Sequence, residues 1–164
     1  MAADPGKLLS LEEAAQRCRR AREKGERVVL ANGLFDLLHV GHLRYLEAAR
    51  ALGDLLLVAV NSDLSAARLK GEGHPLVPAA ERMELLGGLA CVDGLVVFEE
   101  DTVETVLRTL RPHVHAKGTD YSAATVPERS VAAEIGAEVA IVGDPKNHAT
   151  RDLIGTIVQR WGVR

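Results

Sequence analysis

A nearly continuous run of aliphatic residues, from Asp54 to Val60, constrains the fold of this chain more than any other segment. A strand that is apolar at successive positions, and not only at alternate ones, must be covered on both of its faces. The polar residues Asn61, Ser62 and Asp63 follow directly and mark its end. We therefore predict a central strand of a parallel sheet with helices packed on both sides.

Five expected strands alternate with helical patterns along the chain. The strands are expected at residues 27–32, 54–60, 95–98, 114–117 and 138–142. The helices are expected at residues 10–25, 43–52, 64–69, 78–91, 102–110 and 151–161, and a further helix is expected to end at residue 136. Ser10 and Glu13 have the spacing of a capping box, and Pro78 suits the first position of its helix.

This alternation predicts an α/β fold, specifically a Rossmann-like, doubly wound, mostly parallel five-stranded sheet with helices on both faces. No internal boundary is visible between residues 1 and 164. We expect one domain, with a helical extension at residues 1–26 and a core at residues 27–161.

The composition limits the classes of partner. Apolar residues make up 47% of the chain, charged residues 26%, and the formal net charge is −3. The chain lacks a basic excess and a long apolar run, so we expect neither nucleic acid nor a membrane as a partner. Cys18 and Cys91 lack metal-ligand spacing, which favours buried thiols in a reducing cytoplasm over a catalytic cysteine. We predict a cytoplasmic protein.

The junction between the first expected strand and the next helix, residues 32–42, carries the strongest chemical signal. Ligands of open parallel sheets bind at the carboxyl ends of the strands, and the first strand–helix turn is a usual place. The chain has no Gly-x-Gly-x-x-Gly pattern at this turn and no P-loop pattern anywhere. Dehydrogenase and P-loop kinase functions are therefore disfavoured.

This junction is instead suited to polyphosphate. Gly33 and Gly41 allow a ligand to approach the backbone, and a helix that begins near Gly41 directs free N–H groups at an anion. His39 and His42 are three residues apart and lie on the same side of the first turn. Both rings can donate hydrogen bonds to phosphate oxygens as charge develops in a transition state.

Two other interpretations of the histidines stay open. A pair at this spacing can bind a metal ion, although no suitable third ligand accompanies it nearby. Either histidine can also cap the helix without touching a ligand. The complete pattern, strand then Asn-Gly-x-Phe-Asp-x-x-His-x-Gly-His then helix, is more specific than either residue and favours a phosphate site. Lys70 starts a glycine-rich loop that is also suited to phosphate, with a solvated surface charge as the alternative.

Residues 32–42 resemble the signature of the His-x-Gly-His nucleotidyltransferases. Further stretches are similar to the D-glycero-β-D-manno-heptose 1-phosphate adenylyltransferases, which occur alone or fused to a kinase. These stretches are residues 60–63, 68–71, 78–83, 98–102 and 117–121. The resemblance runs from about residue 27 to residue 161, which leaves no room for the kinase half and implies the stand-alone form.

The resemblance implies a reaction in which heptose 1-phosphate and ATP give ADP-heptose and pyrophosphate, with Mg²⁺. Such a product supplies heptose for lipopolysaccharide or other surface glycans. The partners are then small-molecule substrates, and relatives that form dimers or larger assemblies imply a homo-oligomer. Within the same chemistry, the alternative is a cytidylyltransferase acting on glycerol 3-phosphate or another polyol phosphate. A non-catalytic nucleotide-binding protein is the alternative from a different class.

The resemblance also implies roles for individual residues. His39, His42 and Lys70 would be catalytic, because they stabilise phosphate charge. The residues implied to bind the nucleotide are Asn32, Gly33, Phe35, Gly41, Lys117, Asp120, Gly143, Thr150 and Arg151. Asp36 and Arg82 are the candidates for substrate binding, with a solvated surface charge as the alternative for Arg82. No protein side chain is assigned to a metal.

One segment departs from the family pattern. The family commonly has Ser-Thr-Thr at the start of the last helix, whereas this chain has Ala149-Thr150-Arg151, preceded by Asn147 and His148. Thr150 keeps one hydroxyl group, and arginine is itself a good phosphate ligand. We therefore predict that nucleotide binding is kept with altered contacts.

Overall fold

The computed structural model describes residues 5–145 and 149–162 and contains one five-stranded parallel sheet. The strands are β1 (Val28–Gly33), β2 (Leu55–Asn61), β3 (Gly94–Phe98), β4 (Val114–Gly118) and β5 (Glu138–Val142). Their order across the sheet is β3-β2-β1-β4-β5, and every neighbouring pair is parallel. The predicted Rossmann-like sheet is confirmed. The strand order reverses between β1 and β4, which makes that crevice the switch point where ligands of such sheets bind.

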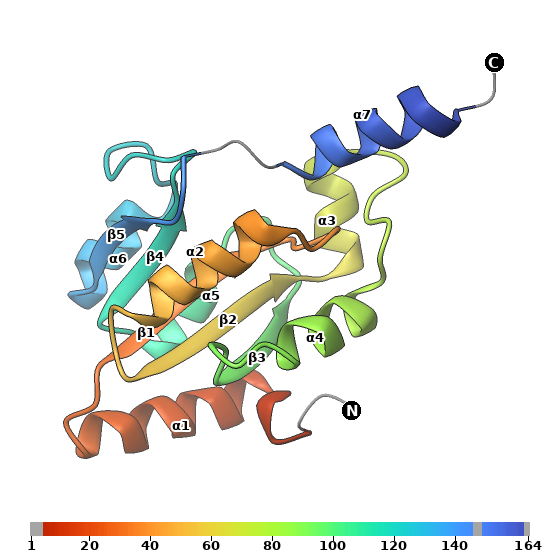
Figure 1. Cartoon of the computed structure of the whole chain (residues 1–164). Helices are drawn as coiled ribbons and strands as arrows, with labels where there is room; N and C mark the ends of the chain where they lie inside the picture. Colours follow the sequence, from red (N-terminus) through yellow and green to blue (C-terminus); the bar gives the residue numbers. More distant parts are fainter. Residues whose placement is uncertain (1–4, 146–148, 163–164) are drawn as a thin grey trace.

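Helices cover both faces of this sheet, as predicted (Figure 1). They are α1 (Leu11–Glu23), α2 (Val40–Arg50), α3 (Asp63–Lys70), α4 (Ala79–Gly87), α5 (Glu104–Leu110), α6 (Arg129–Ile135) and α7 (Thr150–Trp161), after a short 3-10 helix η1 (Pro5–Lys7). One apolar core lies between the sheet and α1, α5 and α6. The second core lies between the sheet and α2 and α4.

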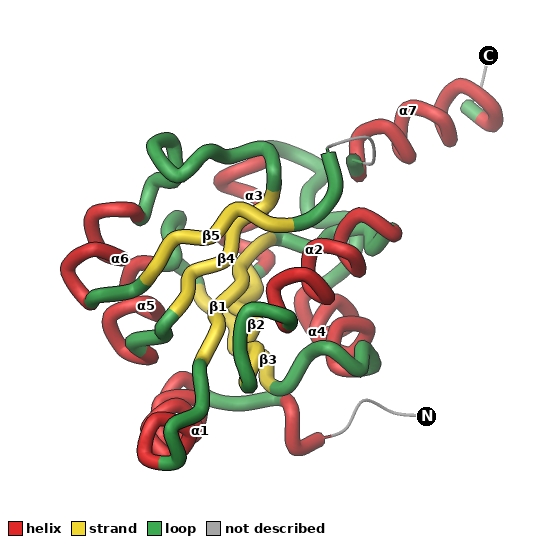
Figure 2. Tube along the Cα trace, turned by 60° about the vertical axis from the view of Figure 1, so that its left-hand side comes forward, coloured by secondary structure: helices red, strands yellow, loops and turns green. Residues whose placement is uncertain are grey.

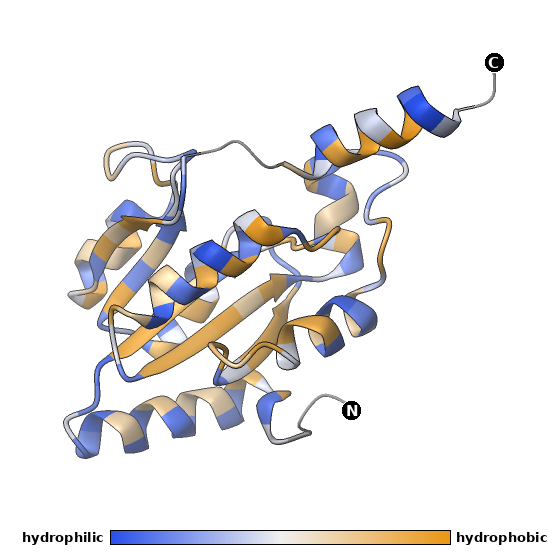
Figure 3. Cartoon of the chain, in the orientation of Figure 1, coloured by the Kyte–Doolittle hydropathy of each residue, from blue (hydrophilic) through white to orange (hydrophobic). Residues whose placement is uncertain are grey.

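β2 confirms the prediction made from its aliphatic run. All its residues are buried, and they alternate between the two cores, with Leu55 and Leu57 on one face and Leu56 and Val58 on the other. Figure 3 shows this strand as a continuous hydrophobic band through the centre of the molecule. A strand buried on both faces stabilises the two helical layers at once, because each successive side chain removes apolar surface from water.

α1 is part of the first core. Its predicted capping box is confirmed, since Ser10 Oγ accepts from the Glu13 N–H and the Glu13 carboxylate accepts from the Ser10 N–H. Cys18 on its inner face is fully buried, and burial raises the pKa of this thiol to about 11. Burial also raises the pKa of Cys91. Both groups are therefore thiols at neutral pH, which does not favour a catalytic cysteine.

Some helix boundaries differ from the predicted ones. Pro78 is the N-cap of α4 rather than its first residue, because its ψ of 149° is extended and its φ of −56° suits either position. The same helix ends at Gly87 and not near Cys91, since Gly87 and Gly88 have low helix propensity. α2 begins at Val40, one residue before the predicted start near Gly41, because His39 caps it.

α7 stands apart from the two cores. It has no buried residue and projects from the body of the molecule in both views of the chain (Figures 1 and 2). Its apolar side chains Leu153, Ile157 and Trp161 are 41%, 50% and 72% exposed. None of the described helices combines the length and the apolar character needed to cross a membrane.

Candidate active site

A cavity of about 840 Å³ lies at the carboxyl ends of the strands and includes the switch point between β1 and β4. Its size is within the range of small-molecule sites. The β1–α2 turn, the α3–α4 loop, the ends of β4 and β5 and the first turn of α7 line it. Every residue predicted for the site lines this cavity except Arg82.

The two histidines cap α2 and face the cavity. His39 is the N-cap, and its Nδ1 accepts from the Gly41 N–H at 3.1 Å. The Nδ1 of His42 accepts from the backbone N–H of His39 at 3.4 Å. A ring nitrogen that accepts a hydrogen bond carries no proton, so the proton of each neutral ring is on Nε2. The structure thus shows both histidines capping the helix. This capping is compatible with a phosphate site, because Nδ1 serves the helix and Nε2–H is the donor offered to a ligand.

His42 is neutral at physiological pH. Burial, with a smaller contribution from His39, lowers its pKa to about 4. The two imidazole rings are stacked with their centroids 3.9 Å apart, and the ring of Phe35 contacts His42 edge-on at 5.3 Å. The rings are thus held in place by packing as well as by the cap, which keeps the donors preorganised for charge in a transition state.

Phe35 adopts an unusual backbone conformation beside these rings. Its φ of 53° lies in the left-handed region, which costs a non-glycine residue about 1 kcal/mol. Its side chain is 3% exposed and packs in the second core, which holds the residue in this conformation. A Cβ at Gly33 would lie 3.2 Å from the Phe35 ring. Glycine at position 33 therefore leaves space for this ring and for the turn that carries the histidines.

A second polar group, which we call the β4 cluster, consists of Asn32, His115, Lys117 and Glu128. Asn32 Oδ1 is 3.0 Å from His115 Nε2 and accepts from Lys117 Nζ at 3.3 Å. Lys117 Nζ also lies 3.6 Å from Glu128 Oε2 and 4.6 Å from the centre of the Tyr121 ring. The cluster sits at the ends of β1 and β4, directly at the switch point.

Burial dominates the titration of this cluster. It lowers the pKa of His115, which Lys117 lowers further, to about 3. Burial also lowers the pKa of Lys117, against the opposing effect of Glu128 and Asp120. Within the described part of the chain, His115 Nδ1 and Glu128 Oε2 have no hydrogen-bond partner. The β4 cluster is therefore buried but incompletely satisfied.

A third polar group, the loop cluster, consists of Asp36, Asp63, His74 and Arg82. The carboxylate of Asp36 is 5% exposed and accepts from the Leu76 and Val77 N–H groups at 2.8 and 2.9 Å. Burial raises the pKa of Asp36, but these hydrogen bonds and the contact with His74 outweigh burial, so its pKa is lowered. Asp36 is ionised and holds the α3–α4 loop against the β1–α2 turn.

The structure places Arg82 outside the cavity, whereas the sequence had predicted a substrate contact. It is fully buried and does not line the cavity. Its guanidinium donates to the carbonyl groups of Val77, Leu34 and Asn61 and to Asp63 Oδ1 at 2.7 Å. Arg82 therefore joins the β1–α2 turn, the end of β2, α3 and the α3–α4 loop. The expected contact with substrate, and the alternative of a solvated surface charge, do not fit this placement.

The far side of the cavity is formed by the end of β5 and the start of α7. Gly143 has a φ of 98°, and a Cβ there would lie 3.3 Å from Tyr45 Cα. The adjacent Asp144 is held by Arg44 at 2.6 Å and by Thr119 Oγ1, which donates to its carbonyl oxygen. These contacts give a defined shape to the segment around Gly143, which is predicted to bind the nucleotide.

The first turn of α7 carries the residues that depart from the family pattern. Thr150 Oγ1 is 3.4 Å from the Leu37 carbonyl oxygen, and the Arg151 side chain is 88% exposed. Both residues line the cavity. Asn147 and His148, which precede this turn, lie outside the described residues.

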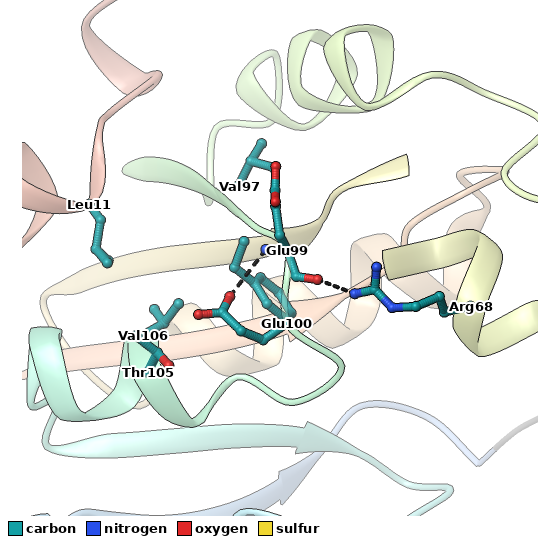
Figure 4. A pocket seen from close by; sticks show the side chains of 8 residues that line it. Leu11, Arg68, Val97, Glu99, Glu100, Thr105 and Val106 are labelled. Carbon is teal, nitrogen blue, oxygen red and sulfur yellow. Dashed lines mark hydrogen bonds between the residues drawn. The ribbon is translucent and has the colours of Figure 1, made fainter. Parts of the chain in front are cut away.

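A second hollow, of about 650 Å³, lies between the start of α1, β3, α3 and α5 (Figure 4). Glu99 and Glu100 line it, and its one cationic side chain among the described residues, Arg68, is bonded to Asp101 and to the Glu99 carbonyl group. Its acidic lining disfavours a polyphosphate ligand. The larger cavity is therefore the candidate active site.

Among the residues of this cavity and its support that sequence reasoning did not assign to the site are His74, His115, Tyr45 and Glu128. His74 lies in the glycine-rich loop that Lys70 starts, and this loop was already predicted to suit phosphate. Tyr45 follows His42 by one helical turn and donates to the Ala116 carbonyl group at 2.8 Å. His115 sits within an expected strand, whereas nothing in the local sequence marks Glu128.

Within the described residues, no three His, Cys, Asp or Glu side chains are grouped to hold a metal ion. The histidine pair is also unsuited to that role, because Nδ1 of each ring serves the cap. A parallel sheet with order β3-β2-β1-β4-β5 and neutral histidine donors at its switch point is suited to binding a phosphate-bearing ligand.

Comparisons with known proteins agree with such a site. The model of the cytidylyltransferase-like family matches residues 30–155, and the chain belongs to this family of nucleotidyltransferases. A bifunctional protein HldE from Geobacter sulfurreducens is 43% identical over 156 residues, which cover 95% of this chain and 32% of the relative. A bifunctional protein HldE from Pseudomonas aeruginosa is 44% identical over 153 residues, which cover 93% of this chain and 32% of the relative. The chain thus spans about a third of the length of these relatives.

A solved structure shares the fold. The lipopolysaccharide core biosynthesis protein from Thermoplasma volcanium has a TM-score of 0.63 and 28% sequence identity to this chain. The match covers 74% of this chain and all of the other.

Proposed function

We propose that this enzyme transfers AMP from ATP to D-glycero-β-D-manno-heptose 1-phosphate, giving ADP-heptose and pyrophosphate. The observation that carries the nucleotidyl transfer is the pair of Nε2–H donors at the start of α2, which face the cavity at the switch point. The sugar is supported by the resemblance of residues 60–63, 68–71 and 117–121 to heptose 1-phosphate adenylyltransferases. Relatives named HldE and a structural neighbour named for lipopolysaccharide core biosynthesis agree with it.

The reaction needs no covalent intermediate. An oxygen of the sugar phosphate attacks the α-phosphorus of ATP, and the bond between this phosphorus and the α–β bridging oxygen breaks as pyrophosphate leaves. His39 and His42 donate from Nε2 to phosphate oxygens, where negative charge is redistributed. The positive end of the α2 dipole adds to this stabilisation. The imidazoles can donate from Nε2 while Nδ1 keeps its capping hydrogen bond, so no existing hydrogen bond has to break first.

The remaining predicted contacts support the phosphates and the base. Lys70, Thr150 and Arg151 would bind phosphate oxygens, while Gly143 and its neighbours would read the base. Family members use a divalent metal with the nucleoside triphosphate, and we propose Mg²⁺ in that role. The donor set fits a metal that enters with ATP, because phosphate oxygens are the ligands that Mg²⁺ prefers and the described residues supply no protein cage.

Pyrophosphate release by the purified chain, assayed with each nucleoside triphosphate and heptose 1-phosphate, tests this proposal. We expect turnover with ATP and Mg²⁺. Faster turnover with CTP and glycerol 3-phosphate would instead establish the polyol-phosphate cytidylyltransferase. Binding of ATP with no turnover on any acceptor would establish a non-catalytic nucleotide-binding protein.

The histidine role has a separate test. His42→Ala should lower kcat by roughly 10²–10³-fold while the Kd for ATP changes little, because the lost donor acts mainly in the transition state. Stopped-flow turnover and calorimetric ATP binding measure the two quantities. Equal losses in kcat and in ATP affinity would contradict a transition-state role.

Two further expectations remain predictions. Residues 1–164 are expected to act as one domain in the cytoplasm, and the chain is expected to form a homo-oligomer. Sedimentation equilibrium of the purified protein tests the oligomer directly.

A further inference from the structure

The α3–α4 loop presents a third histidine to the active-site cavity. His74 lines the same cavity as His39, His42 and Lys70. Its loop belongs to the part of the chain that follows β2, and β2 and β4 lie on opposite sides of β1 in the sheet. The loop can be followed in Figure 1 as the yellow-green segment between α3 and α4. Gly71 and Gly73, which flank Glu72, both have positive φ values and let the chain turn twice before His74.

A buried carboxylate fixes the orientation of this third imidazole. His74 Nδ1 lies 3.1 Å from Asp36 Oδ2, and Asp36 is itself held by two backbone N–H groups of the same loop. An ionised carboxylate can only accept, so His74 Nδ1 must be the donor. The second ring nitrogen, Nε2, is therefore the one available to a ligand.

This arrangement is opposite to that of the other two histidines. In His39 and His42 the capping bonds leave the proton on Nε2, so these rings donate to phosphate when neutral. In His74, Nδ1 instead donates to Asp36, which leaves Nε2 for a ligand. His74 is thus oriented by a carboxylate, whereas His39 and His42 are oriented by backbone N–H groups.

The topology indicates which substrate meets His74. The segment expected to read the base follows β5, and Lys117 and Asp120 follow β4, so the nucleotide side of the cavity is the β4–β5 half of the sheet. The loop with Lys70 and His74 comes from the β2 half, across the switch point. The acceptor must approach the α-phosphate from the side that the nucleotide leaves open.

We propose that His74, oriented by Asp36, binds the phosphate group of the acceptor substrate. This inference rests on the proposed nucleotidyl transfer to a sugar phosphate. The contact is a hydrogen bond between His74 Nε2 and an oxygen of the acceptor phosphate, with one proton between the two atoms. No oxidant, metal or further reactant is required. Asp36 then acts as a positioning residue, and its predicted direct contact with substrate is replaced by this indirect one.

Steady-state kinetics of the full chain test the proposal. His74→Gln should raise the KM for the acceptor phosphate by roughly 10- to 100-fold, the range for a lost hydrogen bond to a charged group, and leave the KM for ATP within about twofold. His74→Arg, which restores a hydrogen-bond donor, should recover most of the acceptor affinity. Glu72→Gln is the matched control, because Glu72 is in the same loop, is exposed and does not line the cavity.

A purely structural role for His74 gives a different pattern. Both KM values would then rise together, the melting temperature would fall, and His74→Arg would not recover acceptor affinity. That result would overturn the proposal.

A measurement without turnover separates this inference from the identity of the sugar. Nitrogen-15 NMR of the imidazole rings should show His74 protonated at Nδ1 and His39 and His42 protonated at Nε2. Addition of inorganic phosphate in the presence of a non-hydrolysable ATP analogue should shift the His74 Nε2 signal. If heptose 1-phosphate is not turned over but this shift occurs, the proposed sugar is wrong and the His74 site stands. If heptose 1-phosphate is turned over and the His74 signal does not move, the His74 site is wrong and the proposed function stands.

Discussion

The β4 cluster and the loop cluster lie beside the same cavity, yet they use their buried polar groups differently. In the loop cluster, Asp36 and Arg82 bond mostly to backbone N–H and carbonyl groups. In the β4 cluster, side chains bond to one another, and two buried atoms, His115 Nδ1 and Glu128 Oε2, have no hydrogen-bond partner among the described residues.

The difference indicates that the two clusters have different roles. Hydrogen bonds from buried charged groups to backbone fix the shape of a loop and stabilise the fold. A buried polar group without a partner costs stability until a ligand or water satisfies it. We infer that the loop cluster stabilises the scaffold, whereas the β4 cluster is arranged for a ligand. The predictions below test this contrast.

The largest effect is expected in the loop cluster. Arg82→Met removes the donors of three backbone carbonyl groups and of Asp63, so the free energy of unfolding should fall by about 3–5 kcal/mol. Urea denaturation followed by circular dichroism measures this loss. A fall below about 1 kcal/mol would show that the loop does not depend on Arg82.

The β4 cluster should give the opposite balance of stability and activity. Replacing both members of its ion pair, Lys117→Met with Glu128→Leu, should leave the free energy of unfolding within about 1 kcal/mol of the parent, because apolar pairs replace buried ion pairs without loss. The same variant should lose roughly 10- to 100-fold in kcat/KM for ATP, the value of a hydrogen bond to a charged group. Loss of stability with retained activity would reverse the proposed contrast.

Acid should affect the two clusters in different pH ranges. The folded pKa of His115 is lowered to about 3, so as pH falls below the unfolded value of about 6.5 the unfolded chain takes up a proton and the folded chain does not. From pH 7 to pH 5 this histidine should reduce the free energy of unfolding by about 2 kcal/mol. His115→Leu should remove that share of the pH dependence, as measured by urea titrations at each pH.

Asp36 titrates in the other direction. Its folded pKa is lowered, so its contribution to stability is complete above the unfolded pKa of about 3.9 and is lost only as pH falls through the lower folded value. The Asp36 carboxylate should therefore contribute no pH dependence of stability between pH 7 and 5. A pH dependence in this range that survives His115→Leu and disappears in Asp36→Asn would contradict the assignment.

The smallest effect is expected outside both clusters. Arg151 is 88% exposed, so Arg151→Ala should raise the KM for ATP only about two- to fivefold, as expected for a screened charge contact. Arg160→Ala, in the last turn of the same helix, is the matched control. Unchanged KM and kcat for ATP in Arg151→Ala would remove Arg151 from the site.

The fold was predictable because its signals are local and redundant. The run that became β2 is apolar at both faces, and the capping box of α1 is visible in two residues. The boundaries that differed, such as Pro78 at the N-cap of α4, depend on one backbone angle that composition does not determine. The strand order was not predicted, because alternation indicates a doubly wound parallel sheet but does not determine which strands are neighbours.

The site was predictable where one continuous segment carries it. Residues 32–42 predict a phosphate site because the strand end, the glycines and the histidines are adjacent in sequence. Arg82 was misplaced because its partners, Leu34, Asn61 and Val77, come from three other segments and appear only on folding. The pairing of Asp36 with His74 is hidden for the same reason, since 38 residues separate the two.

The projecting position of α7 has a consequence for energetics. An isolated helix of 12 residues is marginal in water, and α7 gains no buried side chain from the two cores. Its amide hydrogens should therefore exchange with solvent far faster than those of β2. If nucleotide binds at Thr150 and Arg151 as we propose, part of the binding free energy would be consumed in ordering this helix. The affinity for nucleotide would then report a folding equilibrium as well as a set of contacts.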